Sequence, residues 1–124
     1  MRLRSDIWVS AYLRRCGAEG VGVALRRRGA PESGAIFVRI DRLDGRSALY
    51  GPAPQSVAVD LEQGVERVFA RMHPAEWIDD QGAETRLARE MAFDPDIWIV
   101  EVEDRDGRPR LDFVPDELGA AGRK

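Results

Sequence analysis

Apolar residues near the start of the chain recur with the period of a helix and form one broad stripe expected to face a core. The residues of this stripe are Trp8, Val9, Tyr12, Leu13 and Cys16. Ser5 and Asp6 offer a capping oxygen and an acid for the first turn, and Gly17 or Gly20 can end the last turn. The pattern predicts an amphipathic helix as the first element of the fold.

Between residues 21 and 50 the apolar period falls to two, which is typical of strands that bury one face. Three strands are predicted, at about 21–26, 36–41 and 46–50. Asp44-Gly45 favours a tight hairpin before the third strand, because both central residues of such a turn need positive φ. In the second strand, alternation places Ile36, Val38 and Ile40 on one face and Phe37, Arg39 and Asp41 on the other.

The stretch from 57 to 72 fits two patterns. Its apolar residues recur at helical spacing around Gly64, but they also fit two strands joined by a turn at Glu62-Gln63-Gly64. Helix and strand therefore both stay open for 57–72. Farther along, the pattern predicts a helix at about 79–92 and a last strand at about 97–104.

These elements predict an α+β fold with a mostly antiparallel sheet of four to five strands and two helices packed on one face, in the order α-β-β-β-(β)-α-β. The length of 124 residues suits a single domain. We expect this α+β domain to cover residues 1–115 and a flexible C-terminal tail to follow at 116–124.

The second face of the sheet needs a partner in this arrangement. Neighbouring residues of a strand point to opposite faces of the sheet. If the neighbours of the following four apolar residues lie under the helices, these four cannot all lie there as well: Phe37, Phe69, Ile97 and Ile99. Some apolar surface is therefore expected to face outward or into another molecule. A homodimer that pairs through this face or through an edge strand is the expected assembly.

Charge is distributed unevenly along the chain, although the total of −3 is small. Residues 1–50 carry ten arginines and five acids, a net +5, and the remaining residues carry −8. We favour mutual neutralisation through arginine–carboxylate pairs, because the halves must pack in one small domain; the alternative is two exposed faces of opposite sign.

The single cysteine, Cys16, excludes an internal disulfide and a zinc site of the usual spacing, and it fits a reducing cytoplasm. No apolar run is long enough to span a membrane. A cytoplasmic protein without membrane contact is therefore expected.

Four blocks of the sequence are specific when taken together: Arg2 to Cys16, Arg42 to Gly45, Leu49 to Pro54, and Phe93 to Asp104. As a set they resemble a small bacterial family known only as domain of unknown function 1491. The resemblance covers nearly the whole chain, from about Leu3 to Asp106. It implies a strand followed by a loop in the stretch before the second helix, which favours strand at about 67–72, and it brings no activity and no catalytic residue.

Cys16 and His73 are the only thiol and imidazole, so a thiol hydrolase would have to pair them. Cys16 lies on the apolar stripe, where a buried and inert thiol is expected, and His73 is expected in an exposed loop. Signatures of serine hydrolases and of glycine-rich phosphate loops do not occur. We predict no cofactor and no catalytic residue.

Carboxylates crowd the end of the last predicted strand. Glu101 and Glu103 project from one face, and with Asp104 they are candidate ligands for a hard cation such as magnesium, as a metal-dependent hydrolase requires. A solvated strand end before the Asp106-Gly107 turn explains the same residues, with arginines of the basic half as neutralising partners.

Arginines at the end of the first strand are candidates for binding nucleic acid. Arg26 and Arg28, which alternation places on one face, would form a phosphate-binding stripe with Arg39, Arg42 and Arg46 of the neighbouring strands, and Phe37 would stack on a base. Alternation sends Arg27 to the opposite face, and the sequence pI of about 5.2 is low for this class of protein.

Tyr50, at the start of a proline-rich corner, and Trp77, in a loop, are candidate contacts for a protein partner. The sequence as a whole favours a small cytoplasmic protein-interaction or structural module without catalytic activity. Two alternatives stay open: a nucleic-acid-binding protein that uses the N-terminal arginines, and a metal-dependent hydrolase that uses the carboxylate cluster.

Overall fold

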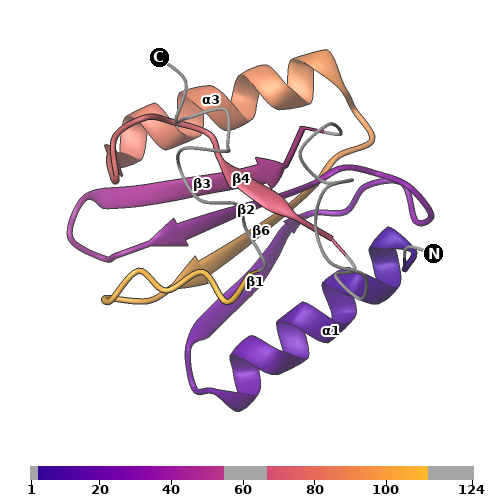
Figure 1. Cartoon of the computed structure of the whole chain (residues 1–124), viewed down its shortest axis with the longest axis horizontal. Helices are drawn as coiled ribbons and strands as arrows, with labels where there is room; N and C mark the ends of the chain where they lie inside the picture. The colour runs from indigo at the N-terminus through magenta and orange to yellow at the C-terminus, as the bar shows by residue number, and fades with distance from the viewer. Residues whose placement is uncertain (1–2, 55–66, 112–124) are drawn as a thin grey trace.

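The computed structural model describes residues 3–54 and 67–111, which form two helices and six strands (Figure 1). The helices are α1 (Ser5–Ala18) and α3 (Asp80–Phe93). The strands are β1 (Gly22–Arg27), β2 (Ile36–Asp41), β3 (Arg46–Pro52), β4 (Phe69–Arg71), β5 (Ile78–Asp79) and β6 (Trp98–Glu103). The α+β class is confirmed, and the expected domain boundary at 115 and the tail at 116–124 lie outside the described residues.

All six strands join one sheet in the order β1-β6-β2-β3-β4, with β5 paired to the start of β3. Only β2 and β6 run parallel, so the described sheet is mostly antiparallel, as predicted. It has six strands instead of four to five, because the two-residue β5 is too short to produce a readable pattern. Residues 69–71 are strand rather than helix, and residues 55–66 fall outside the described part of the chain.

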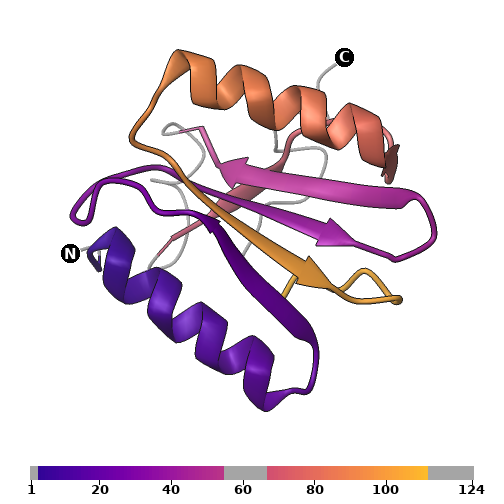
Figure 2. The same cartoon turned by 180° about the vertical axis from the view of Figure 1, so that it is seen from behind.

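The two helices cover opposite faces of the sheet, so the prediction that both pack on one face is wrong (Figure 1, Figure 2). The α1 face contains Ile36, Val38, Ile40, Trp98, Val100 and Val102. The α3 face contains Phe37, Leu49, Ile97 and Ile99. The central strands β2 and β6 carry apolar residues on both faces, so each face packs against its own helix.

The same arrangement corrects the expectation of exposed apolar surface. Phe37 is 6% exposed, and Ile97 and Ile99 are each 1% exposed, because Ala83 and Leu87 of α3 pack over them. Phe69 lies on the other face, under α1, and is 2% exposed. The apolar argument for a dimer therefore no longer holds for this face.

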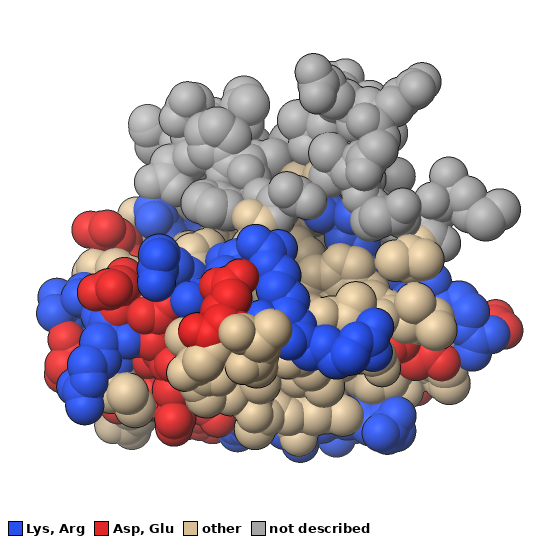
Figure 3. Space-filling model, turned by 90° about the horizontal axis from the view of Figure 1, so that it is seen from below, with Lys and Arg blue, Asp and Glu red and all other residues tan. Residues whose placement is uncertain are grey.

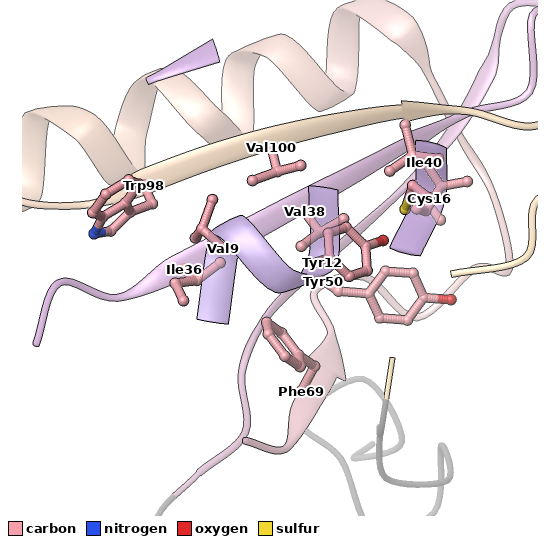
Figure 4. Close-up of a cluster of buried hydrophobic side chains, with 12 residues drawn as sticks. Val9, Tyr12, Cys16, Ile36, Val38, Ile40, Tyr50, Phe69, Trp98 and Val100 are labelled. Carbon is pink, nitrogen blue, oxygen red and sulfur yellow. The ribbon is translucent and has the colours of Figure 1, made fainter. Parts of the chain in front are cut away.

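The α1 stripe forms the larger core, as predicted. Val9, Tyr12 and Cys16 point from the helix into a layer of β2 and β6 side chains, with Tyr50 and Phe69 beside them (Figure 4). Apolar residues of β1 that pack against this core, Val23 and Leu25, are only half-buried, as expected of a strand at the edge of a sheet.

The start of α1 differs from the prediction in one detail. Ser5 is not the capping residue: it is the first residue of the helix, and its buried hydroxyl donates to the carbonyl of Gly34 at 2.7 Å. At α3 the capping residue is Asp79, which accepts a hydrogen bond from the amide of Gly82. Neither helix of the described residues is long and apolar enough to cross a membrane.

Candidate functional site

Arg39 is the buried centre of a group of ion pairs on the α3 face. Its side chain is 7% exposed, and its guanidinium donates to Asp80 at 2.9 Å, Glu84 at 2.6 Å and Glu101 at 2.9 Å. The Nε of Arg39 donates to Ser47 Oγ at 3.1 Å. Every guanidinium nitrogen of Arg39 therefore has an acceptor.

Local sequence places these partners. Arg39 and Glu101 are opposite each other in the parallel register of β2 and β6, so both project toward α3. Asp80 and Glu84 stand four residues apart in the first turns of α3 and therefore share the helix face that meets the sheet. The acid in the first turn is also favoured by the helix dipole.

Arg26 of β1 extends the group. It donates to both carboxylate oxygens of Glu84, at 2.8 and 3.0 Å, and lies 3.9 Å from Glu101. This bidentate hydrogen bond, together with the charges of Arg26 and Arg39, holds the pKa of Glu84 below its usual value, although partial burial opposes the shift. We name the six residues Arg26, Arg39, Ser47, Asp80, Glu84 and Glu101 the Arg39 network.

The Arg39 network joins the basic first half of the chain to the acidic second half, and it confirms the expected pairing of arginines with carboxylates. Arg26 and Arg39 come from the half with charge +5, and all three carboxylates come from the half with charge −8. The network links α3 with four strands of the sheet, β1, β2, β3 and β6.

A second ion pair lies at the far end of β6. The side chains of Asp104 and Arg110 are 7% and 5% exposed and meet at 2.8 Å, and Arg110 also pairs with Glu19 after α1. Burial works to raise the pKa of Asp104, but the hydrogen bond from Arg110, with the amide of Asp106 and the nearby arginines, brings it below its usual value. The hydroxyl of Tyr12 donates to the carbonyl of Pro109 at 2.7 Å, so the segment after β6 is tied to α1.

The three candidate metal ligands do not meet. Glu101 belongs to the Arg39 network, Asp104 pairs with Arg110, and Glu103 is exposed and lies beside Gly22 of β1. Within residues 3–54 and 67–111, no group of three His, Cys, Asp or Glu side chains is placed to hold a metal ion.

The arginines proposed for nucleic acid are separated by a β-bulge. The register of β1 against β6 shifts between Leu25 and Arg27. As a result, Arg26 reaches Glu84 on the α3 face, whereas Arg28 lies over the ring of Trp98, 5.6 Å from its centroid, on the α1 face. Simple alternation, which placed Arg26 and Arg28 on one face, is wrong here because a bulge changes the parity of the strand.

Three further candidate contacts are interior residues. Phe37, Arg39 and Tyr50 are each 6% exposed and are held in the two cores and the Arg39 network. Trp77 is half-buried, with Arg42 over its ring at 4.5 Å. On the face seen in Figure 3, arginines and acids are interspersed rather than gathered into one basic area.

The thiol and the imidazole both serve the fold. Cys16 is fully buried, as expected, and burial raises the pKa of its thiol, which opposes formation of a nucleophilic thiolate. His73 was expected to be exposed, but it is 1% exposed: its Nε2 accepts from the amide of Leu49 at 3.0 Å, and its Nδ1 lies 2.7 Å from the carbonyl of Ala75. The imidazole thus accepts the hydrogen bond that the Leu49 amide would otherwise donate to a neighbouring strand.

Sequence reasoning did not identify Asp80, Glu84, Arg110 or the role of His73. A signal existed for Asp80 and Glu84, because two acids four residues apart on a helix form a ready partner for a buried arginine. No comparable local signal existed for the pairing of Arg110 with Glu19 or of His73 with the amide of Leu49, which are 91 and 24 positions apart in the sequence.

Comparison with known proteins gives a consistent result. The profile of the family described as "Protein of unknown function (DUF1491)" matches residues 3–112. A crystal structure of a DUF1491 family protein from Caulobacter crescentus CB15 shares 31% sequence identity, covers 93% of this chain and 100% of that chain, and has a TM-score of 0.72. A solution structure of a protein from A. tumefaciens shares 44% identity over 83% of this chain and 86% of that chain, with a TM-score of 0.68. No curated protein matches the chain.

Proposed function

The chain belongs to the DUF1491 family of proteins of unknown function, and we propose that it acts in the cytoplasm as a protein-interaction module without catalytic activity. The free outer edge of β1 carries this proposal. β1 is the terminal strand of the sheet, and no described residue pairs with its outer side. In Gly22–Leu25, the backbone N–H and C=O groups that point away from β6 have no strand partner among the described residues, and these four residues carry no charged side chain that would oppose pairing with another strand.

The side chains that other functions would need are used elsewhere. Buried Arg39 and its carboxylate partners hold α3 in place, the buried pair of Asp104 and Arg110 holds the C-terminal segment, and Cys16 and His73 are core residues. Breaking these interactions to bind a substrate or a nucleic acid would leave buried charges without partners. The backbone edge, by contrast, is available without any rearrangement.

A matched pair of alanine variants tests the proposal. Ala24 in β1 and Ala92 near the end of α3 are both exposed, so a lysine fits at either position. A charged side chain on a strand edge opposes pairing with another strand. We expect Ala24→Lys to remove partners that the tagged wild-type protein and the Ala92→Lys control both retain from a lysate of the source organism, with the retained proteins identified by mass spectrometry.

Three results would overturn the proposal. The first is a set of retained proteins, including copies of the chain itself, that Ala24→Lys leaves unchanged. The second is a retarded nucleic-acid species in a mobility shift at low salt, which would favour the N-terminal arginines as the site. The third is binding heat with magnesium or manganese in a titration calorimeter, which would favour the carboxylates at the end of β6.

A further inference from the structure

The proposed use of the β1 edge is the premise of a more specific inference. We propose that a second copy of this chain pairs with β1 in antiparallel orientation, about a two-fold axis that passes beside Ala24. The two sheets then continue into one another across the β1 strands. Such a pairing is isologous: each copy presents the same strand to the other.

The two ends of β1 carry complementary charge. Arg26, Arg27 and Arg28 follow one another at its C-terminal end. Beside its N-terminal end lies Glu103, which is exposed and forms no ion pair with any residue in the described part of the chain. Because antiparallel pairing brings the start of one strand to the end of the other, Arg26 of each copy comes near the unpaired Glu103 carboxylate of its mate, whereas Arg28 lies on the opposite face of the sheet.

The Glu103 carboxylate can reach the outer edge of β1 because Gly22, which lies between them, has no side chain. Gly22 is opposite Glu103 in the ladder, and a Cβ on Gly22 would lie 2.8 Å from Glu103 Oε1. The Glu103 side chain therefore lies over the glycine, in the space that a larger residue would occupy. With the axis at Ala24, Arg26 of the second copy is opposite Gly22. Its two terminal nitrogens hold Glu84 of its own chain, and its Nε is the group that would meet Glu103 across the glycine.

The apolar side chains of β1 fit the same register. Residues that oppose each other in antiparallel strands lie on the same face of the sheet. An axis at Ala24 places Val23 opposite Leu25 of the other copy, twice, and both residues are only half-buried in one chain. The bulge at Arg26 ends the regular part of the strand, so the pairing is limited to Gly22–Arg26.

Cysteine substitution tests the position of the axis. Residues beside a two-fold axis meet their own copies, with Cβ atoms about 4.5–5.5 Å apart, which is compatible with a disulfide after a small adjustment. We expect Ala24→Cys to form a covalent dimer under mild oxidation and Ala92→Cys, on α3, to remain uncrosslinked. Cys16 is fully buried and does not contribute.

Charge reversal tests the complementarity. We expect sedimentation equilibrium to show a reversible dimer of the wild-type chain, and we expect Glu103→Lys to raise its dissociation constant by about tenfold, because the contact occurs twice. Glu76→Lys is the control, since Glu76 is exposed in the loop before α3 and makes the same change of net charge. Circular dichroism and thermal unfolding establish that each variant is folded.

The outcomes separate this inference from its premise. The second-copy inference is overturned if the wild-type chain stays monomeric at submillimolar concentration, if Ala24→Cys crosslinks no better than Ala92→Cys, or if Glu103→Lys and Glu76→Lys behave alike. If the chain is monomeric but Ala24→Lys still removes a partner from the lysate, β1 binds a different protein, and the proposed function stands without the second copy.

Discussion

Replacement of Arg39 by methionine is the most direct test of how the Arg39 network stabilises the fold. Methionine is similar in length and flexibility but removes the charge and all four guanidinium interactions. Three carboxylates then share one end of the α3 face with Arg26 as their remaining cation in the network. The expected result is a large loss of stability with the fold otherwise retained.

The magnitude follows from the exposure of the partners. Removing one member of a fully buried ion pair costs about 3–5 kcal/mol. The carboxylate side chains here are 47%, 46% and 24% exposed for Asp80, Glu84 and Glu101, so water can solvate them when Arg39 is absent. Discounting for this solvation gives a loss of about 2 kcal/mol, or a fall in Tm of roughly 8 °C.

Urea denaturation at pH 7 measures this loss, with Arg46→Met as the control. Arg46 is on the neighbouring strand β3, but its side chain is 51% exposed and its partner Asp44 is two residues away, so no measurable change is expected. A double-mutant cycle with Glu101→Gln isolates one pair, because the combined loss should be smaller than the sum of the single losses. If Arg39→Met costs no more than Arg46→Met, the network does not stabilise the fold and the reasoning fails.

Three further predictions concern the fold. His73→Ala removes the acceptor of a buried β3 amide and leaves a cavity, so we expect a loss of about 2–4 kcal/mol in urea denaturation, and a loss near zero would contradict its structural role. The pKa of Asp104 is lower in the folded than in the unfolded chain, so its pair with Arg110 stabilises the fold above the usual pKa of 3.8 and loses this effect as the pH falls below it. Thermal unfolding from neutral to acidic pH should therefore show a shallower acid limb for Asp104→Asn than for wild type, and equal slopes would refute this. Gly29→Ala should destabilise the fold, since a Cβ there would overlap the backbone just before β6. Gly17→Ala, in open space on α1, should stabilise the fold by roughly 0.5–1 kcal/mol. A higher melting temperature for Gly29→Ala than for Gly17→Ala would contradict both assignments.

Short-range pattern was sufficient for most elements. Alternation in β2 correctly assigned Ile36 and Phe37 to opposite faces, and the stripe that includes Tyr12 and Cys16 correctly identified the core side of α1. Where a single residue changed the parity, the pattern failed. The bulge at Arg26 places Arg28 on the other face, and no feature of the neighbouring sequence predicts this bulge.

The sequence predicted less of the candidate site than of the fold. Charge counts predicted that the halves of the chain would neutralise each other, which the pairs of Arg39 confirm. They gave no indication that Arg39 is buried or that Glu101 faces it. That depends on the parallel pairing of β2 with β6, between residues about sixty positions apart. The prediction that His73 is exposed was wrong for a similar reason: its ring accepts from the amide of Leu49, which lies in the middle of β3, 24 positions away.

By itself, the sequence determined most of the helices and strands and their apolar sides, because these properties depend on neighbours two to four positions away. It left helix and strand open at 57–72 and did not predict the two-residue β5. The tertiary structure alone decided the strand order, with β6 placed between β1 and β2, and the position of the two helices on opposite faces. Both depend on how segments distant in sequence satisfy each other's backbone and bury each other's apolar faces. The same order leaves β1 at the edge of the sheet, where its backbone groups are open to a partner.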